Sequence, residues 1–98
     1  SVINLQELCF GIGKSSHPQR MLSYVAALKR LYTLLPYTPA CAEHAGKLRA
    51  QLEQQGQPIG PFDLQIAATV LAHNLTVVTR NTREFERVPG LHLENWYD

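Results

Sequence analysis

The order of one helix and one strand constrains the fold of this chain more than any other sequence feature. The segment "GPFDLQIAATVLA" contains Pro61, which suits the first position of a helix, and an apolar pattern typical of a helix follows it. The run "LTVVT", residues 75–79, follows a short turn and is rich in β-branched residues, which predicts a strand. A helix that leads directly into such a strand is typical of α/β domains with a mainly parallel sheet. The helix residues expected to be buried are Leu64, Ile66, Ala67, Val70 and Leu71.

Further helical and extended patterns fit the same architecture. Apolar residues at helical spacing predict helices over residues 4–12, 19–35 and about 39–55, the last opening at Pro39. The segment "TLLPYT", residues 33–38, is expected to be extended, and alternation over residues 91–96 predicts a second strand after the turn at Pro89 and Gly90. The predicted core face of the third helix consists of Cys41, Ala45, Leu48 and Leu52.

Composition indicates one ordinary globular domain over residues 1–98. The chain is 45% hydrophobic and 17% charged, which excludes a disordered chain, and its net charge of +1 excludes a tight nonspecific nucleic-acid binder. Neither a membrane span nor a signal peptide is visible, so we expect a cytoplasmic protein. Cys9 and Cys41 lack metal-ligand spacing and are expected to be buried free thiols.

Oxygen-bearing side chains stand at the expected ends of helices and strands. Asp63 lies in the first turn of its helix, Asn81 follows the predicted strand, and Glu7 lies three residues after Asn4. In parallel sheets ligands collect at the carboxyl ends of the strands, and Mg²⁺ needs oxygen ligands from several segments. Each residue taken singly also has a structural explanation, because helix caps and turns favour the same residue types.

Three stretches carry a family resemblance: "SVINLQELCFGIGKS", "AEHAGKLRAQLEQQGQPIGPFDLQIAA" and "LTVVTRNTREFERVPGLHLENW". Together they resemble the PIN-domain ribonucleases of the VapC toxin type over essentially all 98 residues. The resemblance implies a three-layer α/β/α fold with a mainly parallel sheet. It also implies that Glu7 and Asp63 match the second and third acidic positions of the family, that Asn81 matches the fourth, and that Thr79 is the hydroxyl residue before it.

The sequence departs from the family pattern at its N-terminal side. Resembling proteins begin with a strand that ends in a motif like "LDTN", whose Asp is the first metal ligand, and only "SVI" matches the end of their second strand. The expectation is therefore a partial PIN domain, N-terminally truncated, with the central first strand missing. Two unpaired strand edges would then remain, and such edges invite pairing with another chain.

The resemblance implies a toxin-type endoribonuclease that uses Mg²⁺ or Mn²⁺ to cleave RNA phosphodiesters, with tRNA or another structured RNA as substrate. Glu7, Asp63 and Asn81 would hold the metal, and we expect these 98 residues alone to be poorly active. The implied partners are a VapB-type antitoxin and a second copy of the chain. The alternatives are a non-catalytic antitoxin-binding module and the remnant of a split toxin gene.

Several other residues have competing structural and functional interpretations. Arg80, Arg83 and Arg87 could contact RNA phosphates, or they could form a solvated charged face with Glu84 and Glu86. We expect the remaining candidates to be structural. Phe85 and Trp96 are expected in the core, with stacking on bases as the alternative. The apolar stripe is also expected in the core, with a dimer or antitoxin groove formed by part of it as the alternative; it consists of Leu22, Val25, Leu28 and Tyr32. The scattered histidines are expected at the surface or at helix ends; they are His17, His44, His73 and His92.

Overall fold

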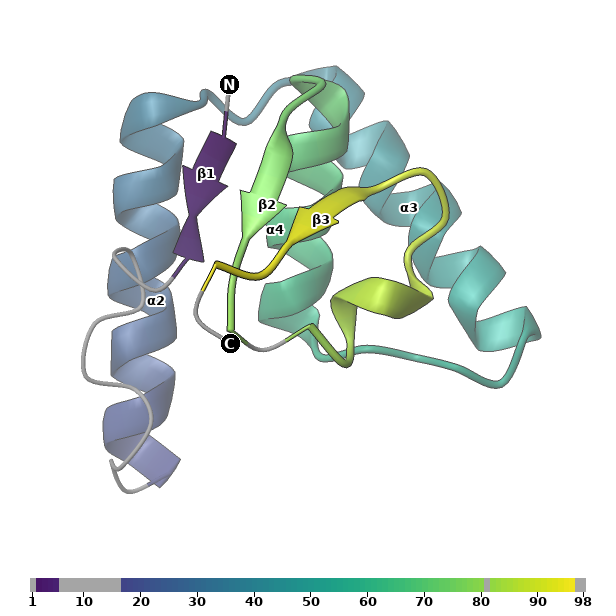
Figure 1. Ribbon diagram of the computed structural model, residues 1–98, viewed down its shortest axis with the longest axis horizontal. Helices are drawn as coiled ribbons and strands as arrows, with labels where there is room; N and C mark the ends of the chain where they lie inside the picture. The colour runs from purple at the N-terminus through teal and green to yellow at the C-terminus, as the bar shows by residue number, and fades with distance from the viewer. Residues whose placement is uncertain (1, 6–16, 81, 97–98) are drawn as a thin grey trace.

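The computed structural model describes residues 2–5, 17–80 and 82–96, and Figure 1 shows how their helices and strands are arranged. The elements are β1 (Val2–Asn4), α2 (His17–Leu34), α3 (Pro39–Gln54), α4 (Pro61–Ala72), β2 (Thr76–Val78), the 3-10 helix η1 (Phe85–Arg87) and β3 (His92–Glu94). They confirm the predicted order of helices and strands. The helix predicted over residues 4–12 falls largely outside the described residues.

The strands form one parallel sheet in the order β1-β2-β3. Ile3 of β1 is opposite Val77 of β2, and Val77 is opposite Leu93 of β3. The expectation that "SVI" contributes a strand is confirmed by β1. The expectation of unpaired edges between two halves of the sheet is wrong for the described residues. Strand β1 pairs directly with β2, so the facing backbone N–H and C=O groups of these two strands are hydrogen-bonded to each other.

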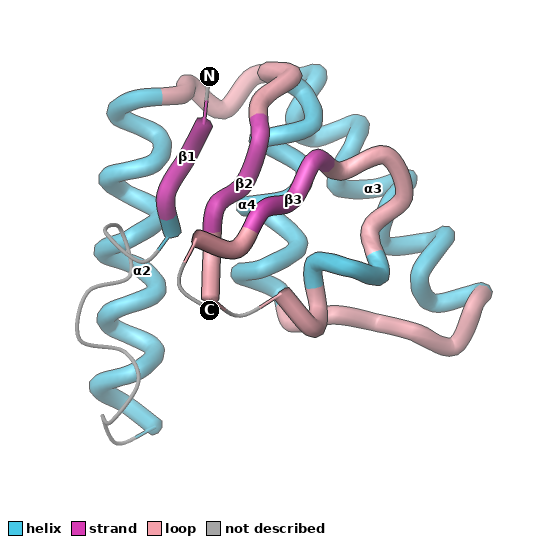
Figure 2. The backbone as a smooth tube through the Cα atoms, in the orientation of Figure 1, coloured by secondary structure: helices cyan, strands magenta, loops and turns pink. Residues whose placement is uncertain are grey.

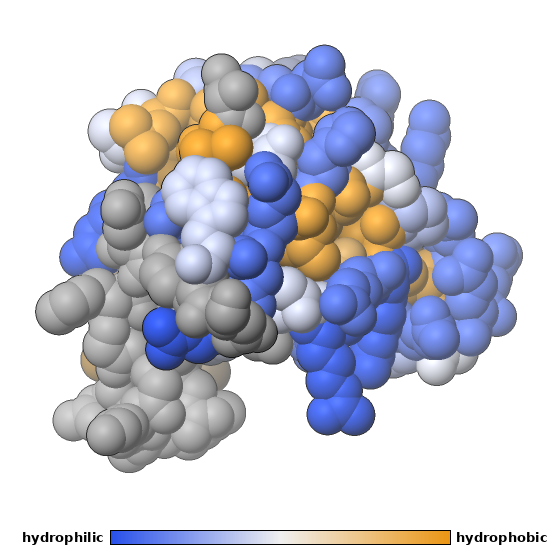
Figure 3. Space-filling view, viewed as in Figure 1, coloured by the Kyte–Doolittle hydropathy of each residue, from blue (hydrophilic) through white to orange (hydrophobic). Residues whose placement is uncertain are grey.

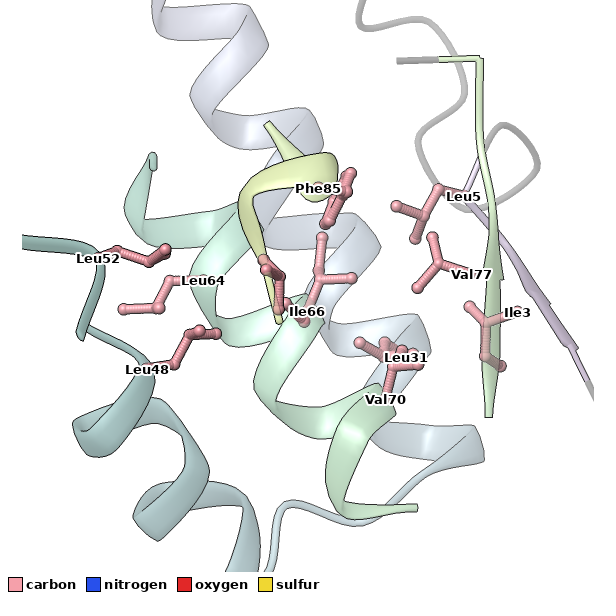
Figure 4. Close-up of a cluster of buried hydrophobic side chains, with 12 residues drawn as sticks. Ile3, Leu5, Leu31, Leu48, Leu52, Leu64, Ile66, Val70, Val77 and Phe85 are labelled. Carbon is pink, nitrogen blue, oxygen red and sulfur yellow. The ribbon is translucent and has the colours of Figure 1, made fainter. Parts of the chain in front are cut away.

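Helix α4 lies at the centre of the core, between α3 on one side and the sheet with α2 on the other (Figure 4). Residues 66–70 of α4 are all buried, as expected for a helix that is packed around most of its circumference. Val77 and Val78 are both fully buried, although neighbouring strand residues point to opposite faces, so both faces of β2 are covered. The predicted core residues Cys41, Ala45, Leu48 and Leu52 are also buried.

Local sequence explains where α3 begins and ends. Pro39 stands at the start of α3, and the hydroxyl oxygen of Thr38 accepts a hydrogen bond from the backbone N–H of Cys41 at 3.4 Å. After the helix, Gly56 adopts a φ of +68°, and Gln57 donates from its backbone to the carbonyl of Leu52 at 2.8 Å. This is the glycine-terminated end that turns the chain toward α4.

Three expectations about apolar residues are wrong. Leu22 is 69% exposed and Val25 is also exposed, because the core contacts of α2 lie further along the helix, around Leu31. The segment 33–38 ends α2 and continues as a loop without strand pairing. Trp96 is 57% exposed beyond the end of the edge strand β3, whereas Phe85 is buried as predicted.

Hydrophilic side chains cover much of the face shown in Figure 3, and apolar side chains are visible there as separate patches. Among the described residues, no helix combines the length and the apolar character that crossing a bilayer requires.

Candidate active site

The carboxyl ends of the strands and the start of α4 lie at the same edge of the sheet. Strands β2 and β3 end at Val78 and Glu94, and α4 runs in the opposite direction, so its first turn begins where the strands end (Figure 1). The loop that leads into α4 and the segment that follows β2 lie on this same side (Figure 2). The predicted position of Asp63 in the first turn of a helix is therefore confirmed, and this helix begins at the carboxyl edge of the sheet.

Two carboxyl groups meet at this edge. The side chain of Asp63 is hydrogen-bonded to the side chain of Glu84, which comes from the segment between β2 and η1. A Cβ placed on Gly60 would lie 3.8 Å from Oε2 of Glu84 and 3.9 Å from Oδ2 of Asp63. Both carboxyl groups therefore converge beside the residue that caps the start of α4.

The environment of Asp63 favours its protonated form. Burial raises the pKa of Asp63 to about 8, and the hydrogen bond and negative charge of Glu84 act in the same direction. The positive end of α4 opposes this effect, but a helix terminus contributes only about 1 kcal/mol in most positions. Asp63 therefore keeps its proton to a higher pH than an ordinary aspartic acid, and in this form it can donate a hydrogen bond to the side chain of Glu84.

Backbone and side-chain contacts of the neighbouring segment place Glu84. Phe85 is 2% exposed and anchors η1 in the core, so the adjacent Glu84 is held close to the protein surface rather than free in solvent. The backbone N–H of Glu86 donates to the carbonyl of Thr82 at 2.9 Å. Arg87 donates from Nη1 to the carbonyl of Pro58 at 2.9 Å and so ties this segment to the loop before α4.

A hollow of about 540 Å³ opens next to the acid pair, within the roughly 300–1,000 Å³ range of ligand pockets. Asp63 and Glu84 form its acidic end, and the remaining lining residues are mostly apolar. Those residues are Met21, Tyr24, Gly60, Pro61 and Phe62.

The other predicted site residues have different outcomes. Thr79 follows β2, is 2% exposed and donates its backbone N–H to the carbonyl of Glu94 at 3.1 Å, which fixes it at the carboxyl edge. Glu7 and Asn81 lie outside the described residues. Arg80 and Arg83 follow β2 and are exposed, so their side chains are accessible to the phosphate groups of a ligand in solution. Arg87 has the structural contact with Pro58 instead.

Glu84 is the site residue that sequence reasoning missed. The alternating charges of "TREFER" favour a solvated face, and this interpretation is correct for the exposed Glu86 but wrong for the half-buried Glu84. The signal that could have found it is the predicted burial of the adjacent Phe85, because a buried anchor restricts where its neighbour can lie.

Carboxylate oxygens suit Mg²⁺ and Mn²⁺, which are bound in many sites by one or two carboxylates together with water. Asp63 and Glu84 provide such a pair, and a cation bound between them would displace the proton that Asp63 holds. Within the described ranges no group of three or more His, Cys, Asp or Glu residues could hold a metal. Cys41 is buried with a free thiol, as predicted, and Cys9 lies outside these ranges.

The histidines are placed as expected where the structure describes their side chains. His44 and His92 are exposed, and His73 ends α4 with a 2.9 Å hydrogen bond between Nε2 and the carbonyl of Pro36.

Comparison with known proteins identifies the family. The PIN domain family matches residues 1–91. The tRNA(fMet)-specific endonuclease VapC of Shigella flexneri is 45% identical over 96 residues, which cover 98% of this chain and 73% of that protein. Ribonuclease VapC2 of Haemophilus influenzae is 41% identical with the same coverage.

Solved structures agree with the sequence relatives. VapBC2 from Rickettsia felis, bound to a DNA fragment from its promoter, is similar with a TM-score of 0.62 and 37% identity, covering 98% of this chain and 74% of that chain. DNA-bound VapBC from Salmonella typhimurium gives a TM-score of 0.61 and 39% identity, with 98% and 75% covered. The fold is the expected three-layer α/β/α type with a parallel sheet, and the chain belongs to the PIN domain family.

Proposed function

We propose that this protein is a metal-dependent endoribonuclease, the toxin of a toxin–antitoxin pair. The observation that carries the proposal is the hydrogen-bonded pair of Asp63 and Glu84 at the carboxyl edge of the parallel sheet. A buried acid whose pKa is strongly raised beside a second acid, in a hollow, is typical of functional sites. Support comes from relatives that are named as ribonucleases and are 41–45% identical to this chain.

The chain's residues have distinct roles in this proposal. Asp63, in its ionised form, and Glu84 would hold Mg²⁺ or Mn²⁺, and Glu7 and Asn81 would supply further oxygen ligands, as the family resemblance implies. The bound metal supplies charge stabilisation at the phosphate and a more acidic water. Thr79 holds the segment before Asn81 at the sheet edge, and Arg80 and Arg83 bind phosphates of the RNA backbone.

The proposed substrate is tRNA. The Shigella flexneri relative is named for specificity toward tRNA(fMet), and it is 45% identical over 98% of this chain. The net charge of +1 supports local recognition rather than binding by bulk attraction. Such an enzyme would act in the cytoplasm, where its substrate is.

A VapB-type antitoxin is the proposed protein partner, because similar solved structures are VapBC complexes. The exposed apolar residues of α2, Met21, Leu22 and Val25, offer a surface for such a partner or for a second copy of this chain. Binding of the antitoxin without RNA cleavage would favour the second candidate function, a binding module.

Cleavage of purified tRNA tests the proposal. We expect weak cleavage, because these 98 residues alone are expected to be poorly active; it should require Mg²⁺ or Mn²⁺, stop in EDTA and disappear in Asp63→Asn and in Glu84→Gln. Glu53→Gln is the matched control, because Glu53 is an exposed carboxylate in an ion pair with Arg49 on α3. Metal-dependent cleavage that survives both acid-pair substitutions would refute the proposed site.

A further inference from the structure

A stacked aromatic pair lies beside the acid pair in the same hollow. Tyr24 of α2 and Phe62 of α4 have ring centroids 5.2 Å apart and planes that differ by only 5°. Phe62 immediately precedes Asp63 in α4, and the side chains of both residues line the same hollow as Tyr24 and Glu84. The hollow therefore has an aromatic wall and an acidic end.

These rings do not belong to the main hydrophobic core. The core cluster of the described residues contains neither Tyr24 nor Phe62, and both side chains are only half-buried. Met21, on the same wall of the hollow, is 48% exposed. Both aromatic side chains thus line the hollow, and aromatic rings stack favourably with other planar groups.

We infer that the Tyr24–Phe62 pair is a stacking platform for one unpaired base of the RNA, next to the phosphate that is cleaved. This inference rests on the proposed ribonuclease function. Unpaired bases are recognised by stacking on aromatic side chains, and stacking accepts any base because every base has a π-face. A platform one residue from Asp63 holds the nucleotide adjacent to the scissile phosphate and so sets which RNA segments enter the site.

The acidic end of the hollow also suits a cationic side chain of a protein partner. The base is the better occupant, because the acid pair that closes the hollow is the proposed cleavage site and its substrate must bring a nucleotide there. Loss of antitoxin binding in a platform variant with unchanged RNA affinity would assign the pair to protein capture and overturn the inference.

The test measures RNA binding separately from cleavage. A short RNA hairpin with 2-aminopurine at one loop position is titrated with the full chain in EDTA, and stacking is followed as quenching of its fluorescence. We expect quenching with the wild type and with Tyr24→Phe, which keeps the ring. We expect about tenfold weaker affinity for Tyr24→Leu, because the loss of base stacking on one aromatic residue typically weakens binding by a factor of this order.

Matched controls separate recognition from packing. Tyr37 is 41% exposed and contacts Tyr32 edge-on, so Tyr37→Leu removes a similar ring from a different aromatic pair and should leave RNA affinity unchanged. An abasic nucleotide placed at successive loop positions should weaken wild-type binding about tenfold at one position. The same position should have no effect in Tyr24→Leu, because the stacking partner is already absent.

The outcomes distinguish the platform from the proposed function. Quenching that depends on Tyr24, without metal-dependent cleavage, supports the platform and refutes the nuclease. Cleavage by Tyr24→Leu at the wild-type KM refutes the platform and leaves the nuclease standing. A lower Tm for Tyr24→Leu with unchanged RNA affinity shows that the pair only packs α2 against α4, and this result also overturns the inference.

Discussion

The proton that Asp63 holds in the native state makes the contribution of Asp63 to stability fall as the pH rises in the metal-free protein. Native Asp63 keeps its proton up to a pKa of about 8, whereas an unfolded Asp ionises near its ordinary pKa of 3.8. Between these values the native state binds one more proton than the unfolded state. The contribution of Asp63 to the free energy of unfolding is therefore largest near pH 4 and decreases by up to about 1.4 kcal/mol per pH unit until the pH reaches about 8.

This slope corresponds to a measurable change in Tm. Between pH 5.5 and 7.5 the contribution of Asp63 decreases by up to about 3 kcal/mol. Since 1 kcal/mol shifts the Tm of a domain of this size by about 4–8 °C, we expect a decrease of the order of 10 °C in EDTA. Added Mn²⁺ should raise Tm most at the higher pH, because the cation replaces the proton.

Asp63→Asn isolates the effect. The Asn amide cannot ionise and can still donate a hydrogen bond to Glu84, so the variant should lose the pH dependence and exceed the wild-type Tm at pH 7.5. Thermal melts followed by circular dichroism in EDTA, with Glu53→Gln as the control, measure both slopes. A slope in Asp63→Asn equal to that of the wild type would show that Asp63 does not hold the proton, and the reasoning would be refuted.

Further predictions concern the helix cap, the core and the substrate contacts. Thr38→Ala removes the cap of α3 and should lower the free energy of unfolding in urea by about 1 kcal/mol, with Thr33→Ala as an exposed control. Leu31 is 1% exposed in the core, so Leu31→Ala should leave a cavity and lower the free energy of unfolding by about 2–5 kcal/mol in the same assay. A decrease of less than about 1 kcal/mol would contradict the buried position of Leu31. Arg83→Ala should weaken RNA binding and reduce the slope of log affinity against log salt by about 0.7, and an unchanged slope would exclude a phosphate contact.

Local sequence was sufficient to predict most of the elements. Pro39 and Pro61 fix the starts of α3 and α4, and the residues predicted to be buried on these helices are buried except Leu71, which is only partly buried. The β-branched run that contains Val77 predicts β2, because such residues pack well in a covered strand. These signals lie within short stretches of sequence, and the helices and the strand form where those stretches predict them.

Tertiary placement was not predictable in the same way. Glu84 is 21 positions after Asp63 in the sequence, and only the packing of Phe85 and the hydrogen bond from Arg87 to Pro58 bring the two acids together. The exposure of Leu22 and Trp96 follows from where the core ends, which periodicity along a helix or strand does not reveal. The direct pairing of β1 with β2 also depends on contacts between distant segments.

The central claim is that Asp63 and Glu84 form a metal site, and calorimetric titration of the full chain with Mn²⁺ tests it most directly. At pH 7 in two buffers of different ionisation heat, we expect binding accompanied by release of a proton, and at least tenfold weaker binding in Glu84→Gln. Glu86→Gln, two residues further on at an exposed position, should bind like the wild type. Equal Mn²⁺ affinity in the wild type and in Glu84→Gln, or the absence of binding by a folded wild-type chain, would contradict the claim.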